Sequence, residues 1–385
     1  MTLTSGLGGQ LSIDLGALAR NWRALDKVSA GALTAAVVKA DAYGTGTEAA
    51  SKALYASGAR FFFVATPDEG LAVRAAVPEA HIFVLYGLYP GAANLYIRQN
   101  LMPVLGSMPM LEEWLAKCVE RNEAYPAAFH FDTGINRLGF RLSEASAVRE
   151  KIEKLGFAPQ MIMSHLACAD QPNHEKNRTQ LALFGSVMQQ FPGIPASLAN
   201  SAGLMSGRDY HFQMVRPGIS LYGGRAVAGR KNPMANVVTL HVPILSVIEG
   251  RTGETVGYGA SYTLNRPSRL AVIGHGYADG LFRSLSGTNQ RPGGKVFVRG
   301  RLCPIVGKIS MDLTIVDITE LGSDLPTPGE GVEVLGANVP IDDQADAAGT
   351  IGYEILTALK GRYNRIYIGD GALPPSQPSQ PHPQG

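Results

Sequence analysis

The first half of the chain alternates short apolar runs with amphipathic stretches. The runs are apolar at nearly every position, which is typical of strands buried on both faces of a parallel sheet. They are Leu33–Val38, Phe61–Ala65, Ile82–Tyr86, Met102–Leu105, Ala127–Phe131, Met161–Ser164, Ser197–Ala199 and Val215–Tyr222. The spacing leaves room for a helix between most pairs. This pattern predicts an α/β fold with a TIM (β/α)8 barrel, although strand counting alone leaves a doubly wound sheet as an alternative.

Two helices are marked clearly within this half. Thr66-Pro67-Asp68-Glu69 places a hydroxyl residue at the N-cap, proline at the first helical position and glutamate at the third. That arrangement predicts a capping box at a helix start. The stretch Glu175–Phe191 carries apolar residues at helical spacing and predicts a second, longer helix.

The pattern changes after Asn236. Helical spacing nearly vanishes until Asp342–Lys360, and short β-rich runs are separated by glycine and proline. These runs predict a second, mostly antiparallel β domain; they are Val237–Ile248, Leu270–Ile273, Lys295–Val298, Leu313–Ile318 and Val332–Leu335. We therefore expect a barrel over residues 10–235 and a β domain over 236–372. Residues 373–385 are rich in Pro, Ser and Gln and are expected to be disordered.

Composition narrows the function classes. The 385 residues are 45% hydrophobic and 17% charged, with a net charge of +2 and no dense basic run. A sequence-independent nucleic-acid binder needs a concentrated positive surface, so that class is disfavoured. Three distant cysteines without a C-x-x-C motif argue against a disulfide framework or a zinc cluster. The first fifteen residues do not resemble a signal peptide, and no apolar run approaches the ~20 residues of a membrane span. We expect a soluble cytoplasmic protein.

Lys39 is the first candidate for chemistry. It directly follows the apolar run Ala35–Val38, and barrel active sites lie at the C-terminal ends of the strands. Partial desolvation there lowers the pKa of a lysine from its usual ~10.4 and frees an amine for Schiff-base chemistry. The glycine-rich stretch Asp41–Gly46 that follows is the type of loop that borders a ligand. For Lys39 alone, a surface lysine at a strand end remains the alternative.

The segment Val37–Gly46 resembles the pyridoxal-phosphate lysine motif of alanine racemases. Further stretches resemble that family in order and spacing, and the resemblance covers residues 10–368. They are Phe131–Gly139, Ser164–Ala167, Asn200–Ala202, Val215–Ile219, Gly257–Tyr262, Gly276–Gly280 and Ser310–Asp312. The resemblance implies a barrel that binds pyridoxal 5'-phosphate, followed by a β domain.

The resemblance also implies a two-base mechanism. Lys39 would hold the cofactor and act as the base on one face of the substrate, and Tyr258 would be the base on the opposite face. His165 matches the histidine that orients this tyrosine. In the family the tyrosine comes from the partner subunit, which implies a head-to-tail homodimer with composite active sites.

Further residues match the family's cofactor and substrate contacts. The cofactor-binding set would be Lys39, Tyr43, His165, Ser201, Arg216, Gly218, Ile219 and Tyr353. Arg216 matches the arginine that meets the pyridine nitrogen. An arginine cannot donate its proton at accessible pH, so the ring nitrogen would stay unprotonated. Arg137 and the backbone N–H of Met311 would hold the substrate carboxylate. Tyr262 and Tyr277 match residues near the entrance, which would admit only small amino acids.

Three positions depart from the family's pattern. Asp41 replaces an asparagine, Thr45 replaces a histidine, and His130 stands where the family often has a lysine that is sometimes carbamylated. A histidine cannot form that stable carbamate, so Arg137 must be oriented in another way, such as by Asp132 or a bound anion. These departures leave the substrate range, alanine alone or alanine and serine, undecided.

The sequence thus favours a racemase that interconverts L- and D-alanine and supplies or consumes D-alanine, which would feed cell-wall peptidoglycan synthesis or catabolism. A decarboxylase or aldolase of the same barrel type is one alternative, but Gly257-Tyr258-Gly259 argues against it. A non-catalytic carrier of the cofactor is another, but such proteins resemble the barrel alone. The spacing of His165, Cys168 and His174 fits no standard zinc pattern, so we expect no metal.

Overall fold

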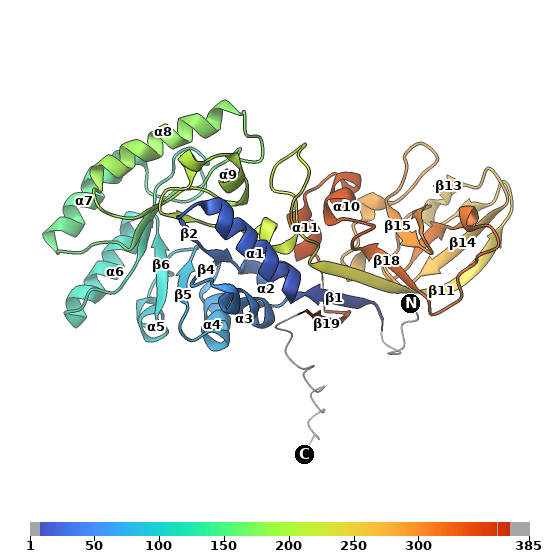
Figure 1. Ribbon diagram of the computed structural model, residues 1–385, viewed down its shortest axis with the longest axis horizontal. Coiled ribbons are helices and arrows are strands. Elements are labelled where there is room, and N and C mark those ends of the chain that lie inside the picture. Colours follow the sequence, from blue (N-terminus) through green and yellow to red (C-terminus); the bar gives the residue numbers. More distant parts are fainter. Residues whose placement is uncertain (1–7, 360, 370–385) are drawn as a thin grey trace, which may run out of the picture. The chain divides into compact units, whose positions relative to one another are not determined.

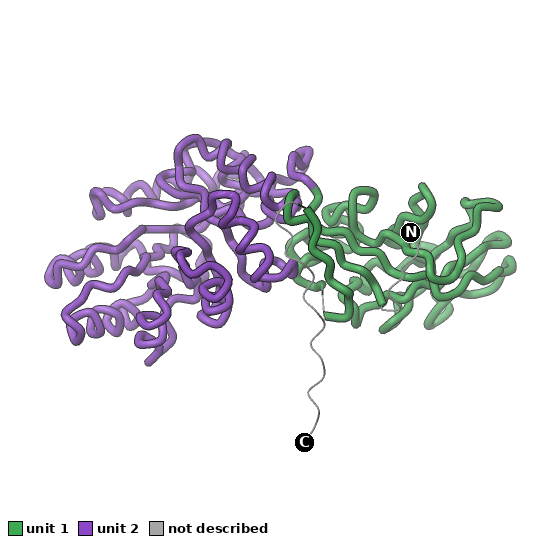
Figure 2. Tube along the Cα trace, turned by 60° about the horizontal axis from the view of Figure 1, so that its bottom comes forward, with its two compact units in different colours: residues 1–17, 236–385 green, residues 18–235 purple. Residues whose placement is uncertain are grey.

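A computed structural model describes residues 8–359 and 361–369 of the chain, and Figure 1 labels its helices and strands. The chain divides into two compact units, which Figure 2 shows in different colours. Residues 18–235 form the barrel unit, and residues 1–17 together with 236–385 form the β unit. Each unit is described by itself below.

The barrel unit is built on a closed ring of short parallel strands. Its sheet runs in the order β3 (Ala36–Val37), β4 (Phe61–Val64), β5 (His81–Val84), β6 (Leu101–Leu105), β7 (Ala128–His130), β8 (Met161–Met163) and β9 (Ala196–Ser197). The ring closes through β10 (Met214–Val215), which pairs in parallel with β2 (Leu33–Thr34). On its other side, Arg216 forms a parallel bridge with Asn200, just beyond β9. The TIM barrel is therefore confirmed, and the doubly wound sheet is excluded.

Helices follow the strands around the outside of the barrel (Figure 1). In chain order they are α1 (Leu15–Ser29), α3 (Thr47–Ser57), α4 (Pro67–Ala76), α5 (Ala93–Arg98), α6 (Met108–Arg121), α7 (Ala145–Lys154), α8 (Glu175–Gln190) and α9 (Ser201–Ser206). The predicted capping box is present at α4: Thr66 Oγ1 accepts the Glu69 N–H at 3.3 Å, and the Glu69 carboxylate accepts the Thr66 N–H at 3.4 Å. The helix predicted over Glu175–Phe191 is also confirmed.

One predicted strand is shorter than its apolar run. The run Val215–Tyr222 was expected to be a strand throughout, but only Met214–Val215 is, and Ile219–Tyr222 forms a 3-10 turn. The reason lies in Pro217, which has no N–H for a strand ladder. Its carbonyl still accepts a hydrogen bond from the Val37 N–H at 3.1 Å. All four residues of the turn are buried, and three of them, Ile219, Leu221 and Tyr222, have largely apolar side chains.

The β unit is a twisted, mostly antiparallel sheet, as predicted. Its main path is β16 (Arg301–Pro304), β15 (Lys295–Val298), β18 (Gly331–Leu335), β11 (Val238–Gly250), β1 (Gln10–Asp14) and β19 (Asn364–Ile368). A branch runs from β11 through β14 (Ser268–Ile273) to β17 (Thr314–Asp317), beside a small hairpin of β12 (Thr255–Val256) and β13 (Tyr262–Thr263). The long strand β11 belongs to both parts, and its pairing register with β14 shifts between Ile244 and Ser246.

Two boundaries differ from the sequence-based expectation. Residues 10–14 were assigned to the barrel, but they form β1, which pairs with β11 and β19 in the β unit. The helix expected over Asp342–Lys360 is two helices, α10 (Ile341–Ala348) and α11 (Gly352–Thr357), because Gly349 ends the first with a left-handed φ of 73°. Lys360 and the predicted tail 373–385 lie outside the described residues.

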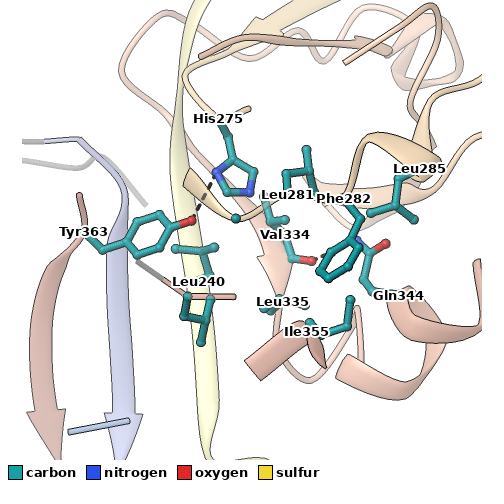
Figure 3. A pocket seen from close by; sticks show the side chains of 12 residues that line it. Leu240, His275, Leu281, Phe282, Leu285, Val334, Leu335, Gln344, Ile355 and Tyr363 are labelled. Atoms are coloured by element: carbon teal, nitrogen blue, oxygen red, sulfur yellow. Dashed lines mark hydrogen bonds between the residues drawn. The ribbon is translucent and has the colours of Figure 1, made fainter. Parts of the chain in front are cut away.

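A small cavity within the β unit contains a buried histidine (Figure 3). His275 is 2% exposed, and its Nδ1 lies 3.5 Å from the hydroxyl of Tyr363, which donates to the carbonyl of Asp279 at 2.5 Å. The surrounding side chains include Leu240, Leu281 and other apolar groups. Burial in this apolar setting lowers the pKa of His275 to about 4.

This histidine makes the β unit sensitive to acid. Because folding lowers the pKa of His275, the unfolded chain binds a proton between pH ~6.5 and pH 4 that the folded chain does not bind. The contribution of His275 to the free energy of unfolding is therefore full above pH ~6.5 and falls as the pH drops toward 4. For His275 the loss between pH 7 and pH 5 is expected to be about 2 kcal/mol. Urea unfolding at both pH values should show this loss in the wild type and a smaller loss in His275→Gln. The exposed histidine replaced in His81→Gln serves as the control, and an equal pH dependence in all three proteins would contradict the prediction.

Candidate active site

The predicted site residues of the barrel unit gather at one end of it. Lys39 follows β3, Arg137 lies in the loop after β7, His165 follows β8, Ser201 begins α9 after β9, and Arg216 directly follows β10. Because all the barrel strands are parallel, their C-terminal ends point the same way. This is the end at which barrel enzymes carry their active sites.

Lys39 is partly buried among charged groups. Burial lowers the pKa of its amine, and the positive charge of Arg137 lowers it further, while the carboxylate of Glu69 acts in the opposite direction. A lowered pKa increases the fraction of neutral amine at physiological pH. The neutral form is the one that can attack a carbonyl or accept a proton.

The turn after Lys39 has an unusual backbone. Ala40, Asp41, Ala42 and Tyr43 all have left-handed dihedrals, with φ between 50° and 55°, although none is glycine. Each such residue costs roughly 1–2 kcal/mol relative to a right-handed conformation. The segment labelled α2 (Lys39–Gly44) is therefore a left-handed turn and not an ordinary helix.

Contacts from other parts of the barrel unit hold this turn. Asp41 Oδ1 accepts the backbone N–H of Thr47 at 2.9 Å, and Glu69 Oε1 accepts the N–H of Ala40 at 2.7 Å. The ring of Tyr43 is buried and stacks on Tyr222, with 4.6 Å between the ring centroids. The turn thus begins directly after Lys39 and places the ring of Tyr43 beside the loop after β10.

Tyr43, Ser201 and Gly218 form a compact polar cradle. The Gly218 N–H donates to Ser201 Oγ at 2.8 Å, and a Cβ on Gly218 would lie 2.3 Å from the hydroxyl oxygen of Tyr43. Ile219 follows with its side chain fully buried. Hydroxyl and backbone N–H donors beside a bare glycine, in the loops after the last two barrel strands, fit the phosphate group of pyridoxal phosphate.

The cradle leads to a test of Gly218. An added Cβ on Gly218 would displace the Tyr43 hydroxyl, and this steric effect is the one expected of Gly218→Ala. We expect cofactor affinity to fall at least about tenfold, as when a charge-assisted hydrogen bond is lost. Titration of the apoprotein with pyridoxal phosphate measures this. Gly185→Ala on α8, where an added Cβ meets nothing within 4 Å, is the matched control and should bind normally. Equal affinities in both variants would contradict the assignment of the cradle.

Arg216 is buried and held rigidly. Its guanidinium donates to the carbonyls of Ser164, at 2.6 Å, and Leu198, at 3.4 Å, and to the hydroxyl of Ser197. These acceptors are all neutral. Burial lowers the pKa of Arg216 to about 9, so the group still carries its positive charge at neutral pH. The hydrogen bonds fix the plane of the guanidinium at the C-terminal end of the barrel.

Two histidines near this arginine are held in the neutral form. Burial, with the charges of Arg216 and Arg137, lowers the pKa of His165 well below its usual range. Burial and Arg216 lower the pKa of His130 to about 4. Within the part of the chain that the structure describes, the buried Nε2 of His130 has no hydrogen-bond partner. A lysine or a carbamate at this position would add a charge that His130 does not.

Asp132 organises the loop that carries Arg137. Its Oδ1 accepts the backbone N–H groups of Gly134, Ile135 and Asn136 at 2.8, 3.0 and 3.1 Å. Its other oxygen accepts from Arg141 Nη1 at 3.2 Å. The carboxylate therefore sets the loop backbone directly, and a bound anion is not needed for that task.

The remaining predicted residues belong to the β unit. Tyr258 follows Gly257, whose φ is 73°, and its side chain is 70% exposed. Met311 is 53% exposed, and its carbonyl accepts the Ala278 N–H at 2.9 Å. Tyr353 lies half-buried on α11. An exposed phenol and an exposed methionine loop are suited to contacts outside their own unit.

Both parts of the chain match models of one protein family. Residues 13–226 match "Alanine racemase, N-terminal domain", and residues 237–367 match "Alanine racemase, C-terminal domain". The chain belongs to the alanine racemase family. The alanine racemase of Rhizobium meliloti is 47% identical to it over 94% of this chain and 97% of that protein.

Other alanine racemases show similar agreement. A biosynthetic alanine racemase of Agrobacterium fabrum is 47% identical over 93% of each chain. The crystal structure of an alanine racemase from Bartonella henselae, described as having covalently bound pyridoxal phosphate, superimposes with a TM-score of 0.88 at 37% identity. It covers 94% of this chain and 99% of that one. The family resemblance found in the sequence is therefore confirmed.

Two further observations concern residues 8–359 and 361–369. None of their helices has the length and apolar character that crossing a membrane requires. No group of three or more His, Cys, Asp or Glu side chains in this part of the chain is arranged to hold a metal ion.

One residue beside Lys39, Glu69, could not be assigned to this alanine racemase site from the sequence. Glu69 was recognised only as a helix-capping residue, yet its carboxylate also reaches the turn after Lys39. The capping box placed the side chain correctly at the start of α4. Nothing local to Glu69 indicates the second contact, because the contact depends on the pairing of β3 with β4.

Proposed function

We propose that this protein interconverts L-alanine and D-alanine with pyridoxal phosphate held by Lys39. The observation that carries the proposal is the position of Lys39. It is partly buried, with a lowered pKa, at the C-terminal end of the first barrel strand, in a chain that matches alanine racemases over both units. When bound there, pyridoxal phosphate supplies a conjugated ring that withdraws electron density from the substrate α-carbon.

Residues around Lys39 would bind the cofactor at its two ends. Tyr43, Ser201, Gly218 and Ile219 would hold the phosphate, with Tyr353 contributing from the β unit. At the other end, the guanidinium of Arg216 would donate to the pyridine nitrogen. It keeps its own proton because its pKa of about 9 lies far above that of a pyridine nitrogen. The nitrogen then stays unprotonated, which limits charge withdrawal and disfavours side reactions such as transamination.

Racemisation needs one proton removed from one face of the α-carbon and one delivered to the other. Lys39 would exchange a proton on its face through its amine. Tyr258 would exchange a proton on the opposite face through its phenol, oriented by the neutral His165. One proton leaves and one arrives, so the reaction is balanced and runs in both directions with the two roles reversed.

Substrate binding and assembly follow from the same set of residues. Arg137, on the loop held by Asp132, would pair with the substrate carboxylate together with the N–H of Met311. The 70% exposure of Tyr258 supports a head-to-tail homodimer in which each chain contributes this tyrosine to the other's site. We place the enzyme in the cytoplasm, where it would supply D-alanine to peptidoglycan synthesis or consume it.

The deciding experiment follows the α-hydrogen. The purified protein with pyridoxal phosphate would be incubated in D₂O with L-alanine and, separately, with L-serine, and the products followed by chiral chromatography and mass spectrometry. Deuterated D-alanine is expected, and the ratio of the two rates sets the substrate range. Deuterated L-alanine without any D-enantiomer would show a one-base site and remove Tyr258 from the mechanism. No exchange despite bound cofactor would point to a decarboxylase, an aldolase or a carrier.

A further inference from the structure

The carboxylate of Glu69 joins two neighbouring strand–helix units of the barrel. Its Oε2 accepts the N–H groups of Ala65, at 2.7 Å, and Thr66, at 3.4 Å, at the start of α4. Its Oε1 accepts the N–H of Ala40 at 2.7 Å, immediately after Lys39. Of these contacts, only the one with the Thr66 N–H belongs to the capping box. The contact with the Ala40 N–H is additional, and it fixes the lysine turn to the start of α4 in the next strand–helix pair of the barrel.

The lysine turn needs such a contact. A left-handed conformation over Ala40–Tyr43 is costly for residues with a Cβ, so it persists only where surrounding groups impose it. Asp41 and Thr47 hold the far end of the turn from within its own loop. At the near end, Ala40 is adjacent to Lys39, and Glu69 is the side chain that engages its N–H.

Glu69 also contributes charge at the lysine. The charged groups that act on the Lys39 amine are Arg137 and Glu69. Lys39 in turn acts on the neighbouring His165, together with Arg216, Arg137 and His130. Glu69 provides the negative charge that opposes the effects of burial and Arg137 on the amine. It therefore influences both where the amine lies and how readily it holds a proton.

We propose that Glu69 is a positioning residue that holds the turn after Lys39 in the geometry needed for attachment of pyridoxal phosphate. The inference rests on the proposed function for the identity of the cofactor. It does not require Glu69 to touch the cofactor or the substrate. The hydrogen bond to Ala40 and the left-handed turn are observations independent of the cofactor.

Two substitutions separate this role from helix capping. A capping box accepts glutamine at the third helical position, so Glu69→Gln keeps an acceptor for the start of α4. The amide has one oxygen, and two N–H donors, those of Ala65 and Thr66, lie on the α4 side against one, that of Ala40, on the other. The oxygen is therefore expected to face α4, with the amide nitrogen toward Ala40, so that the hydrogen bond to the lysine turn is lost. Thr66→Ala does the reverse: it removes the hydroxyl that caps Glu69 N–H and leaves the Ala40 contact in place.

Amide hydrogen exchange of the apoprotein is the first readout. In Glu69→Gln the peptide spanning residues 38–45 should exchange faster than in the wild type, while in Thr66→Ala it should match the wild type. Faster exchange of this peptide in Thr66→Ala, to the same degree, would trace the effect to α4 and overturn the proposal. Unchanged exchange in Glu69→Gln would also overturn it.

The pH dependence of cofactor attachment is the second readout. The rate at which the apoprotein attaches pyridoxal phosphate, followed by visible absorbance, should reach half its plateau at lower pH in Glu69→Gln, because a negative charge near the amine is gone. The affinity should fall about tenfold, as expected for loss of a hydrogen bond to a charged acceptor. Thr66→Ala should change neither, and a wild-type profile in Glu69→Gln would overturn the proposal. Failure of the wild type to attach the cofactor would refute the proposed function, while the exchange comparison would still decide the role of Glu69.

Discussion

Lys39→Ala is expected to abolish racemisation, with a loss of more than about 10⁴-fold in rate. The substitution removes both the attachment point of the cofactor and the base on one face of the substrate, and acid–base catalysis by one positioned group alone contributes about 10²–10⁴-fold. Initial rates with each enantiomer of alanine measure the loss.

A control lysine separates this effect from general damage. Lys52 lies close to Lys39 in the sequence, on α3, and forms an exposed ion pair with Glu48. Lys52→Ala should therefore keep full activity. Borohydride reduction of the wild-type holoenzyme, followed by peptide mass spectrometry, should place the cofactor on Lys39. Racemisation that survives in Lys39→Ala, or label on a different lysine, would refute the assignment.

Tyr258→Phe is expected to lower racemisation by about 10²–10⁴-fold while leaving cofactor binding intact. Tyr258 is 70% exposed within its own chain, and phenylalanine keeps the ring, so the fold of each chain should be as stable as in the wild type. In D₂O the variant should still exchange the α-hydrogen of one enantiomer without inversion, because the base on the Lys39 face remains. Chiral chromatography with mass spectrometry separates exchange from inversion.

Tyr55→Phe is the matched control for this substitution, since Tyr55 lies in the barrel unit near the end of α3, which leads into the N-terminal end of β4 and not into the strand ends that carry the site. It should behave as the wild type. Full racemisation by Tyr258→Phe would mean that another group delivers the second proton. Loss of the cofactor in this variant would instead show that Tyr258 acts in binding and not in proton exchange.

Local patterns in the sequence located most of the barrel strands and marked the start of α4. Strands buried on both faces must be apolar throughout, so the runs at Phe61–Ala65 and Met161–Ser164 carried their own evidence. Two strands of the β unit, β1 and β19, were harder to find. β1 and β19 pair with each other although they lie at opposite ends of the chain, and nothing local indicates such a pairing.

The helix boundaries show the same division between local and distant causes. Gly349 ends α10 and so divides the predicted segment Asp342–Lys360 into two helices. The sequence does not show this division, because a glycine that ends a helix looks the same as one tolerated inside a helix. β10 ends just before Pro217, although apolar residues continue beyond it. Burial favours apolar residues in a turn as much as in a strand, so the apolar run does not mark where the strand ends.

The sequence by itself determined which reactive groups are present and in what order, and through their spacing it determined the family. Lys39, His165, Arg216 and Tyr258 were all proposed as site residues from the motifs around them. Such motifs are readable because each needs particular residue types at fixed local spacing. What those groups do also depends on their environment, and this information is not local.

Only the tertiary structure decided that environment. The left-handed turn at Ala40–Tyr43 cannot be recognised from its residues, because residues of these types normally avoid that conformation. The turn exists because Glu69 and Tyr222 hold it from elsewhere in the barrel. The lowered pKa of His130 likewise results from burial near Arg216, far away in the chain. Strain and electrostatics depend on distances between strands, and folding alone brings those strands together.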